Sequence, residues 1–241
     1  MNALTAADYA DTGQWRLILK IFGDGMEAYL ENTLHEDVGQ QRLFSVNWDA
    51  DESTLRGNVE NAVYDNPRVL DDFSTKIILY DRKTIFSPSE LVEENGVEGF
   101  HTAVYPCEPV DIMSDVDDDV TATYSMAPGL KSFLYRTFPG SRIYSHLMDM
   151  FISHRNNGEG MRMYVEIRKT EADILLVNGR NLISAATHTW RDHADVVYFI
   201  LNTLSVYGVP YNDVDLYISG ERLSTDISSK LKKQLHSVER I

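Results

Sequence analysis

Apolar residues occupy every second position from 15 to 22, which is the period of a strand with one buried face. A turn with two glycines follows at 23–25, and a second alternating stretch at 26–31 completes a predicted hairpin. The pattern then predicts a third strand, a helix with apolar residues at helical spacing, a short strand and a second helix. These further elements are expected at 43–48, 51–64, 76–80 and from a cap at Ser87.

The same succession returns in the second part of the chain. Three strands are predicted at 161–168, 172–177 and 181–188, then a helix that starts near Thr189 and Asp192. A strand at 214–218 and a helix capped by Ser224 complete it. Arg16 and Arg162 occupy matching places, about 146 residues apart. Three antiparallel strands followed by a crossover helix into a parallel strand are typical of a ribonuclease-H-like domain. We therefore predict an α/β protein with two ribonuclease-H-like halves, the actin-like ATPase fold.

The pattern also divides the chain into domains. We expect a polar N-terminal arm at 1–12, a first half at 13–125 and a second half at 126–241. The segment 99–124 contains Pro106, Pro109 and a run of aspartates and is interpreted as a connection between the halves. A helix at 128–138, a strand at 142–147 and a helix at 148–154 are expected to open the second half.

Several stretches of sequence together resemble a known family. They read WRLILKIFGDGMEAYL from Trp15, SMAPGLKSFLYRTFPGSRIYSHLMDMFI from Ser125, and MRMYVEIRKTEADILLVNGRNLI from Met161, with DHADVVYFILNTL and DVDLYISGE beyond. The chain is similar here to an uncharacterised family from Bacteroidetes whose members have an actin-like ATPase fold. More distantly it resembles the pilus-assembly and cell-division members of the actin superfamily. The resemblance implies a bacterial protein and a fold, and it implies no established activity.

Composition narrows the classes of partner. The chain has 241 residues, with 37 acidic and 22 basic side chains and a net charge of −15. Such a charge argues against nucleic acid or an anionic membrane as the partner, because phosphate groups bind clustered Lys and Arg. The single cysteine, Cys107, excludes an internal disulfide framework and a multi-cysteine zinc site. No signal peptide or membrane span is expected, so the predicted location is the cytoplasm.

The actin-like resemblance implies two phosphate loops, each glycine-rich with an aspartate that holds Mg²⁺, and a glycine turn near the adenosine. Gly23, Asp24 and Gly25 form the first candidate loop, although the aspartate lies in the turn and not at the end of the strand. An ordinary hairpin turn, with glycine at positive φ, explains the same residues. The second tip, 168–171, has no glycine to let the main chain approach phosphate. Gly220 is the candidate at the adenosine end.

We therefore expect a degenerate nucleotide site with no catalytic residue. The candidate cofactor-binding residues are Gly23, Asp24, Gly25 and Gly220. No cofactor is expected, and ATP with Mg²⁺ is the alternative.

Other candidate sites have simpler interpretations. His188 and His193 are five residues apart, not the four that place a helical metal pair on one face, so no metal is predicted. The run 115–119 lacks the glycine of a calcium loop and is interpreted as a solvated loop. The strand 15–22 holds no carboxylate, which argues against a ribonuclease-H nuclease. Cys107, beside Glu108, is expected to be unreactive.

Three hypotheses of function follow. The first is a pseudo-ATPase: a non-catalytic scaffold or protein-interaction module that binds another protein or itself. The second is an ATP-binding actin-like ATPase or sugar-kinase-like enzyme that uses the turn at 23–25. The third is a small-molecule binder in the cleft between the halves. The missing glycine of the second loop favours the first hypothesis and argues against enzyme activity.

Overall fold

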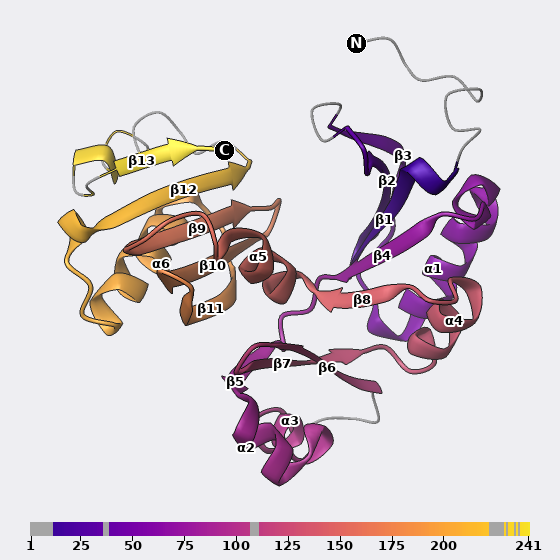
Figure 1. Ribbon diagram of the computed structural model, residues 1–241, viewed down its shortest axis with the longest axis horizontal. Helices are drawn as coiled ribbons and strands as arrows, with labels where there is room; N and C mark the ends of the chain where they lie inside the picture. The colour runs from indigo at the N-terminus through magenta and orange to yellow at the C-terminus, as the bar shows by residue number, and fades with distance from the viewer. Residues whose placement is uncertain are drawn as a thin grey trace. The chain divides into compact units, whose positions relative to one another are not determined.

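The computed structural model describes residues 12–35, 39–106, 111–221, 229, 231–233, 235 and 237–241. The chain divides into two compact units, Met1–His146 and Leu147–Ile241. Figure 1 shows a twisted sheet in each unit, and the two are described separately below. In the described residues no helix has the length and apolar character needed to cross a membrane.

The first unit is built on a five-stranded sheet with the order β3-β2-β1-β4-β8. Its strands are β1 (Trp15–Phe22), β2 (Gly25–Asn32), β3 (Gln40–Asn47), β4 (Ser74–Leu79) and β8 (Arg142–Ser145). The first three strands form an antiparallel meander, and β4 and β8 run parallel to β1. Helices α1 (Glu52–Asp65) and α4 (Leu130–Thr137) pack with β1 in one hydrophobic core, in which Leu17 is fully buried.

The second unit repeats this sheet, with the order β11-β10-β9-β12-β13. Its strands are β9 (Met161–Ile167), β10 (Glu171–Asn178), β11 (Asn181–Thr189), β12 (Val214–Gly220) and β13 (Ser237–Arg240). Strand for strand, the meander and the parallel partners match those of the first unit. Helix α6 (His193–Val206) covers one face of this sheet through Val196, Ile200 and Leu204. The predicted duplication of ribonuclease-H-like halves is thereby confirmed.

The start of α6 differs in detail from its prediction. The capping box joins Asp192 and Asp195, because Asp192 accepts from the first turn and Asp195 reaches back to the cap. Thr189 instead ends β11.

The division between the units lies after His146 and not near Ser125. The reason is strand pairing: β8 lies beside β4, with Arg142 opposite Lys76, so residues well beyond 125 complete the first sheet. Helix α5 (His146–His154) then begins at the division. The boundary taken from the sequence therefore differs from the division that the structure shows.

The segment 99–124, interpreted as a connection, lies within a folded insertion in the first unit. The insertion contains β5 (Ile85–Pro88), α2 (Ser89–Asn95), α3 (Val97–Val104), β6 (Asp111–Asp117) and β7 (Val120–Met126). Its strands form a separate sheet in the order β5-β7-β6. Figure 1 shows α2 and α3 on the side of this small sheet that faces away from β8. Ser87 lies in β5, and the helix begins at Ser89, one residue later than a cap at Ser87 predicts.

The expectation of a solvated loop at 115–119 holds for the exposed turn at Asp118 and Asp119 and is wrong for residues 115–117, which belong to β6. Asp115 lies in β6 and accepts hydrogen bonds from the main chain of Ser145 (2.7 Å) and from the hydroxyl of Tyr124 (3.1 Å). Asp81 similarly accepts from the main chain and hydroxyl of Ser125 in β7. Burial and the carboxylate of Asp115 raise the pKa of Tyr124. These carboxylates fasten the insertion to the first sheet.

Candidate functional site

The first candidate loop is the two-residue turn between β1 and β2. Phe22 lies opposite Gly25, and Gly23 and Asp24 are exposed at the tip. Neither Gly23 nor Gly25 has a positive φ, so the conformational explanation predicted for these glycines is wrong. Gly25 is required for space, because a Cβ there would lie 2.7 Å from the carbonyl oxygen of Val46 on β3. Nothing lies within 4 Å of a Cβ placed at Gly23.

A tryptophan that follows β3 holds this turn from the side. The indole N–H of Trp48 donates to the carbonyl of Gly23 (3.0 Å), and its main-chain N–H donates to the carbonyl of Asp24 (2.9 Å). Both carbonyls at the tip are thus engaged within the protein. The turn geometry is set by β3 and needs no ligand to fix it.

The second candidate loop is held in the same way. The indole N–H of Trp190, which follows β11, donates to the carbonyl of Arg168 (2.9 Å). Its main-chain N–H donates to the carbonyl of Thr170 (3.0 Å). In both units the clamp therefore joins the first and last residues of the turn. Sequence reasoning missed this contact, although its signal was visible as a tryptophan immediately after the third strand of each half.

The side chain of Arg168 closes the second turn. Its Nε and Nη2 each lie 2.9 Å from a carboxylate oxygen of Asp173, and its Nη1 pairs with Glu171. Asp173 is fully buried and also accepts a hydrogen bond from the hydroxyl of Thr187 (2.6 Å). The main-chain N–H of Arg168 donates to the carbonyl of Glu171 (2.8 Å). Both carboxylates that follow this turn, Glu171 and Asp173, are thus bound to the guanidinium of Arg168, and the first main-chain N–H of the turn is used within the turn.

Gly220 ends β12 beside the end of β9. Its φ is +79°, and a Cβ there would lie 2.1 Å from the carbonyl oxygen of Ile167. The next residue, Glu221, donates its main-chain N–H to that same oxygen at 2.7 Å. This glycine therefore has a packing role at the close approach of two strands, whether or not a ligand contacts it. It lies in the second unit, while Gly23, Asp24 and Gly25 share one turn of the first.

The histidines have aromatic and backbone partners. His188 stacks on Phe199 with ring centroids 4.4 Å apart, and burial lowers its pKa, although the charge of Asp173 opposes the shift. His193 lies beside the ring of Trp190. His146 is buried, with Nδ1 3.3 Å from the carbonyl of Leu79. No group of three potential metal ligands is found in the described part of the chain, and Cys107 lies outside it.

His154 belongs to an aromatic stack at the end of α5. Its ring lies 4.0 Å from that of Tyr164, which stacks in turn on Tyr217. Arg162, 2% exposed, donates to the carbonyl of His154 at the end of the helix and to that of Gly179. Burial, and then the charge of Arg162, lower the pKa of His154. Burial raises the pKa of Tyr217.

Comparison with known proteins places the chain in a family. The model of a protein family of unknown function, DUF3822, matches residues 6–237. The chain belongs to the DUF3822 family. No curated protein matches the sequence.

Solved structures confirm the fold. A Bacteroides thetaiotaomicron protein, described as having an actin-like ATPase fold and unknown function, superimposes with a TM-score of 0.83 at 19% identity. That match covers 97% of this chain and 93% of the other. The PilM-PilN type IV pilus biogenesis complex matches with a TM-score of 0.53 at 9% identity, covering 94% of this chain and 88% of that one. This DUF3822 protein therefore has the actin-like ATPase fold.

Proposed function

We propose that this protein is a pseudo-ATPase that serves as a protein-interaction scaffold. The single observation that carries the proposal is the second turn, where the guanidinium of Arg168 is bound to Asp173 and Glu171. A phosphate loop offers unpaired main-chain N–H groups and space beside them. Here one N–H is used inside the turn, and side chains occupy 168–171 without a glycine.

The same cluster argues against a magnesium site at this turn. Mg²⁺ binds through carboxylates that can accept it or its water ligands. Asp173 is fully buried and its two oxygens accept from Arg168 and Thr187. Withdrawing Asp173 from this network would break two hydrogen bonds with Arg168 and leave Glu171 as the remaining carboxylate partner of that partly buried guanidinium.

A role in protein assembly is supported by another protein that has this fold and occurs in a complex. PilM, which shares the fold, is known from a complex with PilN. That likeness concerns the fold, and it supports the proposal only as a precedent for an actin-like protein that works in a complex.

An ATP-binding protein is the second candidate, because Gly23 and Asp24 are exposed and the space beside Gly23 is open. Thermal unfolding with and without millimolar Mg-ATP separates the two. A ligand at a hundred times its Kd adds about 2.7 kcal/mol, and each kcal/mol raises the Tm of a chain of this size by about 2–4 °C. We expect a change below about 1 °C. A rise of several degrees that Asp24→Ala abolishes would refute the proposal.

A further inference from the structure

Strand β11 forms one edge of the second sheet and differs from the other outer strands of the two five-stranded sheets. It has nine residues, Asn181–Thr189, and none of them is charged. The other three outer strands, β3, β8 and β13, each contain an arginine, and β8 and β13 have only four residues. Charged side chains and short length are common means of keeping an edge strand from pairing with another chain. Among the outer strands that the structure describes in these two sheets, β11 alone is both long and uncharged.

The direction of the main-chain groups of β11 follows from its pairing with β10. This pairing has no irregularity from 184 to 189, and the main-chain N–H of Trp190, the next residue, donates to the carbonyl of Thr170. Inward and outward residues alternate in an antiparallel pair, so the even-numbered residues of this stretch bond to β10. Ala185 therefore directs its N–H and C=O away from β10, toward the outer edge of the sheet. Figure 1 shows β11 at the lower margin of the second unit.

The side of α6 that lies beside β11 presents apolar side chains. The ring of Phe199 stacks on that of His188 in β11, with ring centroids 4.4 Å apart. Asn202 and Val206 follow Phe199 at i+3 and i+7, so they lie on the same side of the helix. Val206 is 68% exposed, and Tyr198, whose ring meets that of Phe199 edge-on, is 62% exposed. The outer edge of β11 and this side of α6 together form what is called the β11–α6 surface below.

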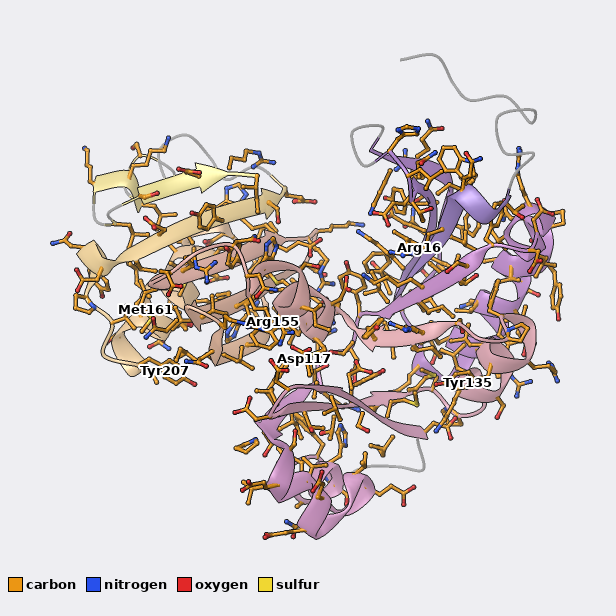
Figure 2. All side chains as sticks on the ribbon, viewed as in Figure 1. Arg16, Asp117, Tyr135, Arg155, Met161 and Tyr207 are labelled. Carbon is orange, nitrogen blue, oxygen red and sulfur yellow. The ribbon has the colours of Figure 1, made fainter. Side chains whose placement is uncertain are left out.

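Charge distinguishes this surface from the rest of the chain. No charged residue occurs from 181 to 190 or from 196 to 212, although 24% of all residues are charged. Tyr207, which follows α6, is also exposed and is labelled in Figure 2 at the lower margin of the second unit. Two copies of a chain with a net charge of −15 repel each other, and the repulsion is weakest where neither copy carries a charged side chain. Few charges and many aromatic side chains are also typical of the buried centre of an interface.

We propose that two copies of this chain associate through the β11–α6 surface, with β11 of one copy paired antiparallel to β11 of the other. One strand can supply both partners of an antiparallel pair, because a two-fold axis relates the two copies. With that axis perpendicular to the sheet, both copies of α6 lie on the same face of the combined sheet, and their Phe199 sides face each other. The inference rests on the proposed scaffold function and deepens it by naming a second copy of the chain as a partner.

Sedimentation equilibrium of the full chain tests the inference, in about 0.15 M salt to screen long-range repulsion. Val206→Glu places a charge on the β11–α6 surface of both copies. Val116→Glu is the matched control, because it adds the same charge at a valine of β6 in the first unit that is 66% exposed. Ala185→Pro removes an outward N–H without removing a bond to β10. Circular dichroism shows whether each variant is folded, and Val206→Glu tests the surface independently of the proline.

We expect a mass twice the 27.4 kDa of one chain at about 100 μM protein, because interfaces of ordinary size have Kd values of about 1 μM or lower. Val206→Glu and folded Ala185→Pro should each raise the Kd of the dimer at least tenfold, and Val116→Glu should change it less than twofold. A monomeric wild-type chain, or equal Kd values for Val206→Glu and Val116→Glu, would overturn the inference. Neither result bears on nucleotide binding, because the pseudo-ATPase proposal is tested by the Mg-ATP melting experiment.

Discussion

Replacing Gly220 with alanine perturbs a very close approach between two strands. The new Cβ would start 2.1 Å from the carbonyl oxygen of Ile167, whereas an ordinary contact begins near 3.4 Å. The ends of β12 and β9 would have to separate by about 1 Å, weakening the hydrogen bond from Glu221 to the same oxygen. Crowding of this kind costs about 1–3 kcal/mol, and a positive φ adds about 1 kcal/mol for a residue with a side chain.

Two matched glycines separate these contributions. Gly208 also has a positive φ (+64°), but nothing lies within 4 Å of a Cβ placed there, so Gly208→Ala should cost about 1 kcal/mol. Gly23 has no positive φ and no atom close to a Cβ placed there. Gly23→Ala should therefore change the free energy of unfolding by less than about 0.5 kcal/mol. Urea unfolding followed by circular dichroism should therefore give about 2–4 kcal/mol for Gly220→Ala. A loss equal to that of Gly208→Ala would show that the strands do not approach as described.

Three further outcomes test other contacts. Trp190→Phe removes the indole donor to Arg168 and should lower the free energy of unfolding by about 1 kcal/mol in a urea titration, and a stability equal to wild type would contradict the clamp. Asp115→Ala removes the acceptor of the Tyr124 hydroxyl and of the Ser145 main-chain N–H, so it should lower the free energy of unfolding by about 1–3 kcal/mol. The amide of Ser145 should then exchange faster with solvent. Unchanged exchange at Ser145 would argue that Asp115 does not fasten the insertion to the first sheet. The pKa of His154 is lower in the folded state than in the unfolded chain, so as the pH falls through about 6.5 the unfolded chain binds more protons and stability falls. His154→Gln should reduce this loss in melting curves between pH 5 and 7, and an unaltered pH dependence would refute the assignment.

The repeated sheets could be predicted from the sequence because their signals are local. Strands such as β1 and β9 carry seven or eight residues with clear alternation, and the hairpins follow directly in the chain. Strand β8 has four residues, and its partner Lys76 lies far from Arg142 in the sequence. No local sequence pattern predicts that β8 pairs with the distant strand β4. The predicted boundary between the halves therefore differed from the observed division between the two units.

The insertion and the turns show where composition misleads. Aspartate has a low strand propensity, and the groups that bind Asp115 come from Tyr124 and from Ser145, a residue thirty positions later. The sequence alone therefore predicts a loop at 115–119, because the hydrogen-bond donors of Asp115 become apparent only in the folded structure. The candidate glycines could be identified from the sequence, but the structural reason for a glycine at each position could not. Gly25 needs space beside Val46, and only the neighbouring strand reveals this.

The duplication lets each half serve as a reference for the other. Both halves have the tryptophan clamp, at Trp48 and Trp190, so the clamp is a feature of the hairpin that the two halves share. The halves differ at the tip itself: exposed Gly23 and Asp24 in one, and the Arg168 fork in the other. They differ again by the acidic insertion, which one half has between its parallel strands. Because the shared features suffice to build both sheets, the features that are not shared are not required by the repeated fold, and they are the places where a specific function can be tested.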